Sequence, residues 1–316
     1  MMPEGLNYKD VYLVPQRTVV SSRKECDTSV SFGSRVFDMP IYPSNMKSVV
    51  SLGMCEYLAR RGFFYTMHRF NVKIVDLIKH FNSVGIFSSV SIGVNEDTYE
   101  DLRETKDSGL KPDFITLDIA NAWCVKAEKM VEWVHKNFPE SFLIVGNVAT
   151  GEAVEDIQEW EGVYAIKVGI AGGSVCITRN KTGFHVPMVT ALMDCCSISK
   201  LPIIADGGIV DHGDMAKALA LGATMVMAGN LFSGYDESAG DIVEINHHRY
   251  KEYFGSASQY NKNEYKNVEG KKILVEYKGS IDRLLVELKE DLQSSISYCG
   301  GTKVDDLYEC PMIKVR

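Results

Sequence analysis

Cys176 lies in a glycine-rich stretch whose composition suits nucleophilic chemistry. The segment Lys167-Val-Gly-Ile-Ala-Gly-Gly-Ser-Val-Cys-Ile-Thr-Arg179 places three glycines within five positions, and a cysteine and a threonine follow them. Glycine lets the backbone approach a ligand closely and turn its N–H groups toward it. A cysteine on such a loop is placed to act as a nucleophile rather than to fill a core. The stretch therefore predicts a bound anion, most simply a phosphate, beside a reactive thiol.

Two other turns combine glycine with a polar side chain. Asp206-Gly-Gly208 and Gly229-Asn230 each follow a short apolar run. Their glycines leave room for an anion against backbone N–H groups, and Asp206 can accept hydrogen bonds from ribose hydroxyls. Together with the cysteine loop, these turns favour a nucleoside monophosphate as the ligand. The alternative is that they are only tight turns.

Thr178 and Glu269 are candidates for moving the proton that such a nucleophile requires. Thr178 stands two residues after Cys176, and Glu269 is the carboxylate of a glycine-bounded turn in a long polar segment. A positioned carboxylate is a common general acid or base. The alternatives are a core cysteine and a solvated glutamate. His68, next to Arg69, either binds a cofactor phosphate or is a buried core histidine.

Short apolar, β-branched runs alternate with amphipathic stretches along most of the chain. Because a chain that alternates strands and helices pairs its strands in parallel, the pattern predicts an α/β protein. The expected strands are Met39–Asn45, Phe63–His68, Phe87–Val94, Phe114–Ala120, Phe142–Val148, Ala165–Ile170, Pro202–Gly208 and Thr224–Gly229. The expected helices include Val49–Arg61, Val72–Phe81, Lys126–Lys136, Gly151–Glu159, Met188–Ile198 and Gly213–Leu221. Eight such units in roughly 250 residues match a (β/α)8 TIM barrel.

An open, doubly wound sheet is the alternative architecture. Such a sheet usually carries a G-x-G-x-x-G turn after its first strand, and that pattern is absent from the sequence. In a TIM barrel, the chemistry lies on loops that follow the C-terminal ends of the strands. Polar residues or glycines follow nearly all of the expected strands, which favours the barrel.

The alternation of strands and helices stops after the last expected strand. The run Ile245–Tyr253 predicts a β-hairpin, and residues 255–272 are too polar to pack and too long for an ordinary loop. Long loops in compact domains are usually functional or disordered, so we expect a mobile flap over the barrel mouth. A final helix is expected at Ile281–Tyr298. With no linker composition along the chain, residues 1–316 are expected to form one TIM-barrel domain.

The composition restricts the class of partner. The formal net charge is −8 and the pI is near 5.5, which argues against nucleic acid or an anionic membrane as partner. No window approaches the ~18 apolar residues of a membrane helix, and the N-terminus has no apolar signal core. None of the eight cysteines forms a C-x-x-C pair. We therefore expect a cytoplasmic protein without a zinc ribbon or redox dithiol.

Taken together, these motifs resemble the IMP dehydrogenase/GMP reductase family, and within it the reductases, along nearly the whole chain. The resemblance is carried by Asn7-Tyr-Lys-Asp-Val11, Ser22-Arg-Lys-Glu-Cys-Asp27, Asn45-Met46, Met67-His68, Leu117-Asp-Ile-Ala-Asn121, Gly146-Asn-Val148, Lys167-Val-Gly169, Gly173-Ser-Val-Cys-Ile-Thr-Arg179, Lys181-Thr-Gly183, Asp206-Gly-Gly208, Lys251-Glu-Tyr-Phe-Gly-Ser-Ala-Ser258 and Glu269-Gly-Lys271. The chain has no room for the inserted CBS pair common in the dehydrogenases. It also lacks their Arg-Tyr pair between Ser258 and Glu269. Both features favour the reductase branch.

The resemblance implies an NADPH-dependent oxidoreductase that converts GMP to IMP and ammonia. Cys176 would attack C2 of the base, with Thr178 and Glu269 handling the proton. The implied substrate contacts are Ser174, Asp206, Gly207, Gly208, Gly229, Asn230, Gly255, Ser256, Ala257, Lys266 and Gly270. The implied cofactor contacts are Ser22, Arg23, His68, Asp118, Ala120 and Asn121, with Ser294 and Tyr298 supplied by a neighbouring subunit of a homotetramer. An implied K⁺ site would use backbone carbonyls of Ala171, Gly173, Cys176, Thr178 and Arg179.

The chain departs from the family pattern at positions expected to face the base, the cofactor or the cation. Ala171 stands where the family has glycine, and Lys47 stands where it has an acidic or amide residue. Ala122-Trp123 and Phe184–Met188 also differ from the usual residues. These departures leave open a modified or deoxy purine nucleotide as substrate, and NADH in place of NADPH. An IMP dehydrogenase-like oxidation and a non-catalytic nucleotide-binding barrel are the remaining alternatives.

Overall fold

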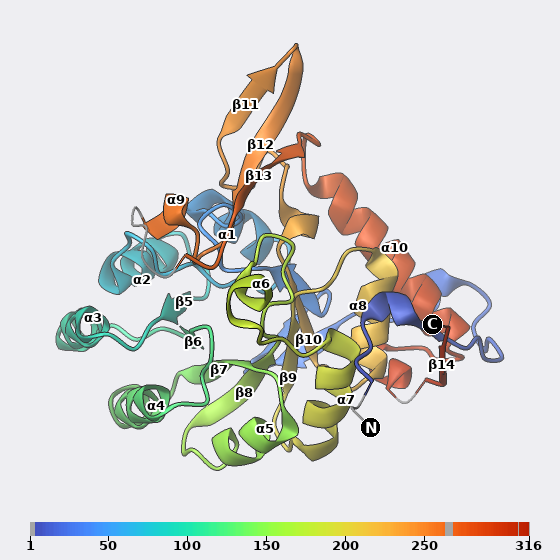
Figure 1. Cartoon of the computed structure of the whole chain (residues 1–316), viewed down its shortest axis with the longest axis horizontal. Helices are drawn as coiled ribbons and strands as arrows, with labels where there is room; N and C mark the ends of the chain where they lie inside the picture. Colours follow the sequence, from blue (N-terminus) through green and yellow to red (C-terminus); the bar gives the residue numbers. More distant parts are fainter. Residues whose placement is uncertain (1–3, 263–267, 309, 316) are drawn as a thin grey trace.

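Parallel strands alternate with helices in the computed structural model, which describes residues 4–262, 268–308 and 310–315 (Figure 1). The main sheet has the order β4-β10-β9-β8-β7-β6-β5, and all its pairs are parallel. Its strands are β4 (Ile41–Pro43), β5 (Ser89–Ile92), β6 (Phe114–Asp118), β7 (Phe142–Val148), β8 (Val163–Val168), β9 (Ile203–Asp206) and β10 (Met225–Ala228). β4 comes first in the sequence and β10 last, yet these two strands pair with each other. The sheet therefore curls as a TIM barrel does. This confirms the expected α/β barrel.

The prediction of a β-strand at Phe63–His68 is wrong. Only one backbone bridge forms there, between Met67 and Val90. Side-chain hydrogen bonds take the place of further backbone pairs. The Tyr65 hydroxyl donates to Phe87 O, and the Thr66 hydroxyl bonds with that of Ser89. The segment therefore lies beside β5 without pairing along its length.

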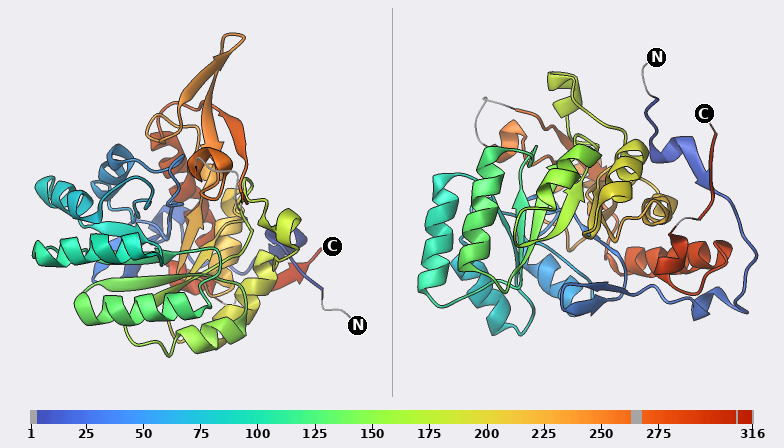
Figure 2. Two further views of the ribbon diagram at one scale, coloured as in Figure 1. Left: turned by 60° about the vertical axis from the view of Figure 1, so that its left-hand side comes forward. Right: turned by 90° about the horizontal axis from the view of Figure 1, so that it is seen from below.

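Helices cover the outside of the sheet in both rotated views (Figure 2). They are α1 (Leu52–Ala59), α2 (Ile74–Ser83), α3 (Glu96–Asp107), α4 (Val125–Asn137), α5 (Gly151–Ile157), α7 (Met188–Ile198), α8 (His212–Ala220) and α10 (Asp282–Tyr298). Each expected helix is present; α7 has the expected bounds, and the others differ by a few residues at one or both ends. The helix α3 was not expected, because its buried residues are only Leu102 and Thr105 and it has almost no apolar stripe.

An aromatic cluster fills the barrel at the end where the strands begin. Phe114 opens β6, and its ring lies 5.0 Å from that of Phe64 and 5.2 Å from that of Phe142. A small hairpin, β2 (Val30–Phe32) and β3 (Arg35–Phe37), adds Phe32, which stacks on Phe114 at 5.9 Å. This end is therefore packed with apolar rings, and polar chemistry is left to the opposite end.

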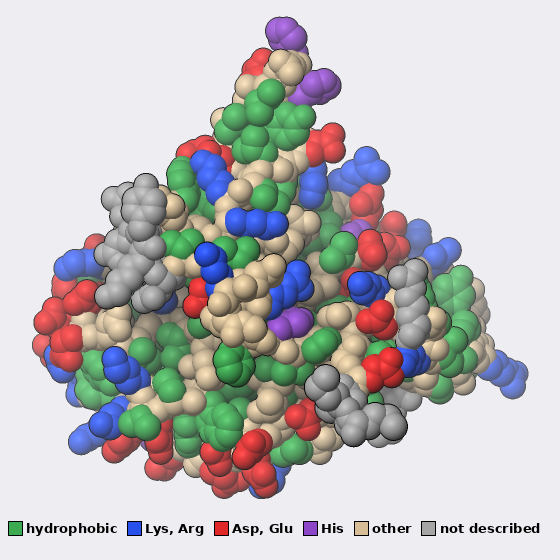
Figure 3. All heavy atoms as spheres, viewed as in Figure 1, with side chains coloured by type: hydrophobic (Ala, Val, Ile, Leu, Met, Phe, Trp, Pro, Cys, Tyr) green, Lys and Arg blue, Asp and Glu red, His purple; other side chains and the backbone are tan. Residues whose placement is uncertain are grey.

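A three-stranded antiparallel sheet projects from the barrel after β10 (Figure 1). It contains β11 (Ile242–Ile245), β12 (His248–Phe254) and β13 (Lys272–Glu276). Asn246 and His247 form the turn with φ of 50° and 66°, as a two-residue hairpin turn requires. The predicted hairpin is confirmed, and the structure adds β13 to it. Figure 3 shows histidines at its tip and basic side chains dispersed among acidic ones on this face.

Short elements complete the described part of the chain. They are β1 (Val11–Leu13), β14 (Met312–Lys314), α6 (Thr178–Thr182), α9 (Gln259–Lys262), and the 3-10 helices η1 (Tyr8–Asp10), η2 (Arg23–Glu25), η3 (Asn230–Phe232) and η4 (Val304–Leu307). β1 pairs with β14, which brings the two ends of the chain to one side of the barrel (Figure 2). Among the described residues, no helix combines the length and the apolar content needed to span a membrane.

Candidate active site

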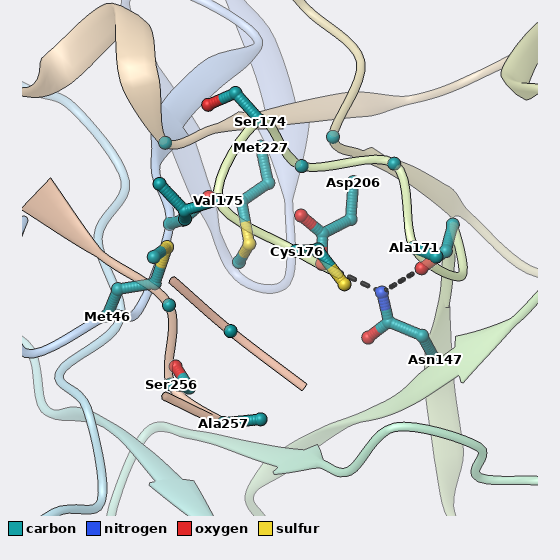
Figure 4. Close-up of a pocket in the computed structure, with 18 of the residues that line it drawn as sticks. Met46, Asn147, Ala171, Ser174, Val175, Cys176, Asp206, Met227, Ser256 and Ala257 are labelled. Carbon is teal, nitrogen blue, oxygen red and sulfur yellow. Dashed lines mark hydrogen bonds between the residues drawn. The ribbon is translucent and has the colours of Figure 1, made fainter. Parts of the chain in front are cut away.

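A cavity of about 470 Å³ lies at the C-terminal ends of the barrel strands. In Figure 4 the side chain of Cys176 points into it. The cavity is lined by the loops after β4 (Ser44–Met46), β6 (Asp118–Ala120), β8 (Gly169–Cys176), β9 (Asp206–Val210) and β10 (Gly229–Asn230), and by Gly255–Ala257, Glu269 and Gly270. The expectation that polar strand ends meet at one mouth is thus met.

The cysteine loop and the segment predicted as a flap are joined by backbone hydrogen bonds. Ile177 N donates to Glu269 O at 2.8 Å, and Lys271 N donates to Val175 O at 2.9 Å. Glu269 N in turn donates to Ala257 O at 2.9 Å. These bonds place Glu269 beside the cysteine loop across a long stretch of sequence. Residues 263–267, which include the expected substrate contact Lys266, lie outside the described residues.

Cys176, Thr178 and Glu269 form one continuous hydrogen-bonded chain. Cys176 Sγ donates to Thr178 Oγ1 at 3.1 Å, and Thr178 Oγ1 donates to Glu269 Oε2 at 2.6 Å. The thiol and the carboxylate are therefore connected through a hydroxyl that can both accept and donate a proton. Such an arrangement can deprotonate a nucleophile and return the proton to a leaving group.

The glycine turns after β8 and β9 pack directly against each other. Gly169 has φ +142°, and a Cβ there would lie 2.0 Å from Asp206 O. At Gly207, with φ +94°, a Cβ would lie 3.2 Å from the carbonyl carbon of Gly172. Side chains are excluded from both positions, so the two turns pack closely at the cavity, and their own N–H groups donate to Val148 O and Met227 O. Ser174, Gly208 and Gly229-Asn230 line the same cavity.

A buried lysine beneath these turns was missed as a functional residue. Lys167 is 1% exposed and donates to Asp118 Oδ1 at 2.8 Å and to Asp206 Oδ2 at 2.6 Å. Lys167 also donates to Asn147 Oδ1. The Asn147 side-chain nitrogen, from which the dashed lines start in Figure 4, donates to Gly169 O and to Asp206 Oδ2. The signal was present in the sequence, since a lysine inside the apolar strand β8 must find buried partners.

Charge pairing decides the protonation state of this cluster. Burial by itself raises the pKa of Asp118, but the Lys167 ammonium and the Arg69 guanidinium outweigh burial and hold the pKa below its ordinary value. Burial likewise lowers the pKa of Lys167, but the carboxylates of Asp118 and Asp206 outweigh it and hold the pKa above its ordinary value. Lys167 and Asp118 are therefore charged at neutral pH.

Tyr253 is a second residue of the cavity that the sequence analysis quoted in a motif but gave no role. Burial raises its pKa to about 12, partly offset by a hydrogen bond with Ser174. A Cβ at Gly229 would lie 2.4 Å from the Tyr253 hydroxyl oxygen. The hydroxyl thus stays protonated at neutral pH beside two of the expected phosphate contacts.

Comparisons with known proteins agree with this geometry. The family model described as "IMP dehydrogenase / GMP reductase domain" matches residues 5–315. The chain belongs to the IMP dehydrogenase/GMP reductase family. A relative from Chromobacterium violaceum named "GMP reductase" is 65% identical over 315 residues, covering 100% of this chain and 99% of that protein. Proteins of the same name from Bacillus thuringiensis (strain Al Hakam) and Bacillus subtilis (strain 168) are each 46% identical, covering 100% of this chain and 97% of theirs.

The residues expected to hold the family's dinucleotide do not all lie together. Asp118 and Ala120 line the same cavity as Cys176. Asn121 is exposed and accepts a hydrogen bond from Trp123 N instead. His68 is buried and accepts a hydrogen bond from Phe70 N at Nδ1, as a core histidine does.

The remaining cofactor candidates lie together at the C-terminal end of α10. Arg23 Nη1 donates to Ser294 Oγ at 2.8 Å, Ser22 caps η2 next to it, and Tyr298 is 63% exposed one turn further along α10. None of these four residues lines the cavity of its own chain. The structure therefore groups Ser22 and Arg23 with Ser294 and Tyr298, not with His68.

The carbonyls expected to hold K⁺ are largely engaged in hydrogen bonds. Gly173 O accepts from Cys176 N at 3.1 Å, Thr178 O from the Thr182 hydroxyl at 2.8 Å, and Arg179 O from Gly183 N at 3.1 Å. Ala171 adopts φ 61°, a left-handed conformation that favours glycine. A carbonyl oxygen has two lone pairs, so one hydrogen bond leaves it able to ligate a cation, and the K⁺ site stays a prediction.

The departures from the family pattern lie mostly outside the cavity. Trp123 Nε1 donates to Asp156 Oδ2 at 2.7 Å, which holds the ring against α5. Phe184 is 76% exposed, and His185 Nδ1 bonds with Ile170 O at 2.8 Å. In the described part of the chain, neither Trp123 nor Lys47 lines the cavity. The expectation that these side chains contact the base therefore lacks support.

Proposed function

We propose that this protein reduces GMP to IMP and ammonia with NADPH. The observation that carries the proposal is the hydrogen-bonded chain from Cys176 through Thr178 to Glu269 inside a cavity bounded by glycine turns. The name shared by the full-length relatives supports the same reaction.

Binding of GMP would follow the distribution of bare backbone and polar groups. The phosphate would occupy the turns at Ser174, Gly208 and Gly229-Asn230, with the Tyr253 hydroxyl beside it. Asp206 keeps Oδ1 free of hydrogen bonds within the described residues, so that oxygen can accept ribose hydroxyls. The base would then lie over Cys176, between the cysteine loop and Gly255–Ala257.

The first half of the reaction uses the proton path already present. Thr178 would accept the Cys176 proton and pass its own proton to Glu269, while the sulfur bonds to C2 of the purine. Glu269 would return the proton to the 2-amino group, which departs as ammonia with the C2–N bond electrons. A C2–S bond then links the base to the enzyme.

The second half regenerates the Cys176 thiolate, which a proton from solvent converts back to the thiol. NADPH, when bound beside Asp118 and Ala120, supplies the hydride that C2 requires. The C2–S bond then breaks with its electrons on Cys176, and IMP is released. The described residues of the flap predicted at 255–272 would exclude water from the site, because water at C2 would give a different product.

Oligomeric state and location follow from the same proposal. The group of Arg23, Ser294 and Tyr298 lies away from the chain's own cavity, which fits a role in a neighbouring subunit's dinucleotide site within a homotetramer. We place the enzyme in the cytoplasm, where its nucleotide substrates are found.

A substrate panel tests the proposal. Loss of NADPH absorbance would be followed with GMP, dGMP and other 2-aminopurine nucleotides, and NADH would be compared with NADPH. We expect GMP with NADPH to give the highest kcat/KM, together with stoichiometric ammonia. Gain of NADH absorbance with IMP instead would indicate a dehydrogenase, and binding without either reaction would indicate a non-catalytic barrel.

A further inference from the structure

Lys167 has no free donor for a ligand although it lies at the cavity. Its ammonium carries three protons, and three acceptors surround it: Asp118 Oδ1, Asp206 Oδ2 and Asn147 Oδ1. With 1% of the residue exposed, water cannot replace any of these partners. The side chain must therefore act through the groups that it holds.

Each of its partners belongs to a different part of the site. Asp118 lies with Ala120 at the end proposed for the dinucleotide, and Asp206 begins the turn proposed for the nucleotide. Asn147 donates to Gly169 O at 2.6 Å, at the start of the cysteine loop. One ammonium thus ties together the strand ends that bind both ligands and present the nucleophile.

We propose that Lys167 is a positioning residue that fixes Asp118 and Asp206 for the two ligands at once. The proposal rests on the proposed function for the identity of those ligands. Its physical basis is that both carboxylates lie within 3 Å of the same nitrogen. Without the cation, two anions in a buried site repel each other and move apart or take up a proton.

The pH dependence of ligand binding distinguishes this role from a purely structural one. The charged and titratable groups that act on Asp118 are Lys167, Arg69 and the hydroxyl of Tyr42, and Asn45 donates a hydrogen bond to it. Burial raises the pKa of Asp118, and without Lys167 only Arg69 and the hydrogen bond from Asn45 would still lower it. The pKa of Asp118 should therefore rise in a variant that lacks Lys167. Dinucleotide affinity in the variant should then increase as the pH rises through the raised pKa of Asp118, whereas the parent stays flat over the same range.

The test uses Lys167→Met, with Lys217→Met as a matched control. Lys217 is also a buried lysine paired with a carboxylate, Asp214 at 3.1 Å, but it lies on α8 outside the cavity. Dissociation constants for GMP alone and for NADPH alone would be measured by calorimetry at several pH values. We expect Lys167→Met to weaken both ligands at least tenfold and to show the pH dependence. Lys217→Met should bind both within about twofold of the parent.

Three outcomes would overturn the proposal: parent-like affinities in Lys167→Met, a flat pH profile, or an equal loss in the control. If Lys167→Met does not fold, the double variant Lys167→Met/Asp118→Asn removes one positive and one negative charge together. It should fold and still bind GMP at least tenfold more weakly, and parent-like GMP affinity would refute the role. Because binding is measured without turnover, an enzyme that fails to reduce GMP would contradict the proposed function and leave this test intact.

Discussion

Thr178 Oγ1 lies 2.6 Å from Glu269 Oε2, although 91 positions separate the two residues in the chain. The contact joins the loop after β8 to the segment that leads into β13. It completes a path from the Cys176 thiol to a carboxylate that would otherwise be remote from it. The chemistry of the site therefore depends on the position of the Glu269 segment against the cysteine loop.

Cys176→Ala should abolish turnover while GMP binding stays within a few-fold of the parent. The thiol forms the covalent bond, whereas phosphate and ribose contacts provide most of the ground-state affinity. NADPH oxidation and calorimetric GMP titration would measure the two properties separately. Turnover within a few-fold of the parent would remove Cys176 from the mechanism.

Thr178→Val should lower kcat by at least 100-fold, because it removes the hydroxyl that relays the proton. The matched control is Thr182→Val at the other end of α6, since that hydroxyl donates to Thr178 O and accepts from Phe184 N but is not part of the path from Cys176 to Glu269. The control should retain kcat within a few-fold. A comparable loss in both variants would indicate that α6 packing, not proton transfer, is what Thr178 supplies.

Glu269→Gln should slow the reaction by about 10²–10⁴-fold with little change in GMP affinity. The amide keeps the size of the side chain and the backbone bonds to Ile177 and Ala257, but it cannot accept and return a proton. Single-turnover release of ammonia is the measurement. A variant that keeps its maximal rate but loses affinity would show that Glu269 only anchors the flap.

Gly229→Ala should raise KM for GMP at least tenfold. The added Cβ would lie 2.4 Å from the Tyr253 hydroxyl oxygen and 3.4 Å from Ser44 Oγ, so the phosphate end of the cavity must distort. We expect about 1–3 kcal/mol of destabilisation from such overpacking. Gly213→Ala on α8 is the control, because its Cβ meets nothing within 4 Å. It should stabilise the fold by roughly 0.5–1 kcal/mol and leave KM unchanged, as steady-state kinetics and thermal unfolding would show.

His68 should make the protein less stable as the pH falls from about 6.5 toward 4. Burial, with a smaller contribution from Lys47, lowers its pKa to about 4. An unfolded histidine titrates near 6.5, so in this window the unfolded chain binds more protons than the folded protein. The free energy of unfolding should fall by up to about 3 kcal/mol across the window. Above pH 6.5 the histidine is neutral in both states and contributes no pH dependence.

Urea unfolding at pH 7.5 and pH 5.0 would measure this effect. His68→Gln should reduce the difference in unfolding free energy between the two pH values. His247→Gln, at the fully exposed hairpin tip, should leave the difference unchanged. An identical pH dependence in the parent and in His68→Gln would show that His68 does not carry it.

The sequence by itself determined the alternation of strands and helices, the cysteine loop and the glycine turns. β8 and β9 are short apolar runs that parallel sheets bury on both faces, and this burial is visible in a single strand's composition. The turns at Gly169 and Gly207 were detectable because only glycine fits their backbone, a purely local constraint. The hairpin around Asn246 was detectable from local sequence too, although its turn residues, Asn246 and His247, are not glycines.

Only the tertiary structure decided which polar groups meet. Lys167 pairs with carboxylates 49 and 39 positions away, and Arg23 with a serine 271 positions away. Such pairs depend on how the barrel closes and on the register of neighbouring strands, which periodicity along one strand does not encode. The same long-range packing turned Trp123 onto Asp156 and replaced the ladder at residues 63–68 with side-chain hydrogen bonds. Local composition indicates where the backbone must bend or be buried, and the packing of the curled sheet decides the partner of each buried charge.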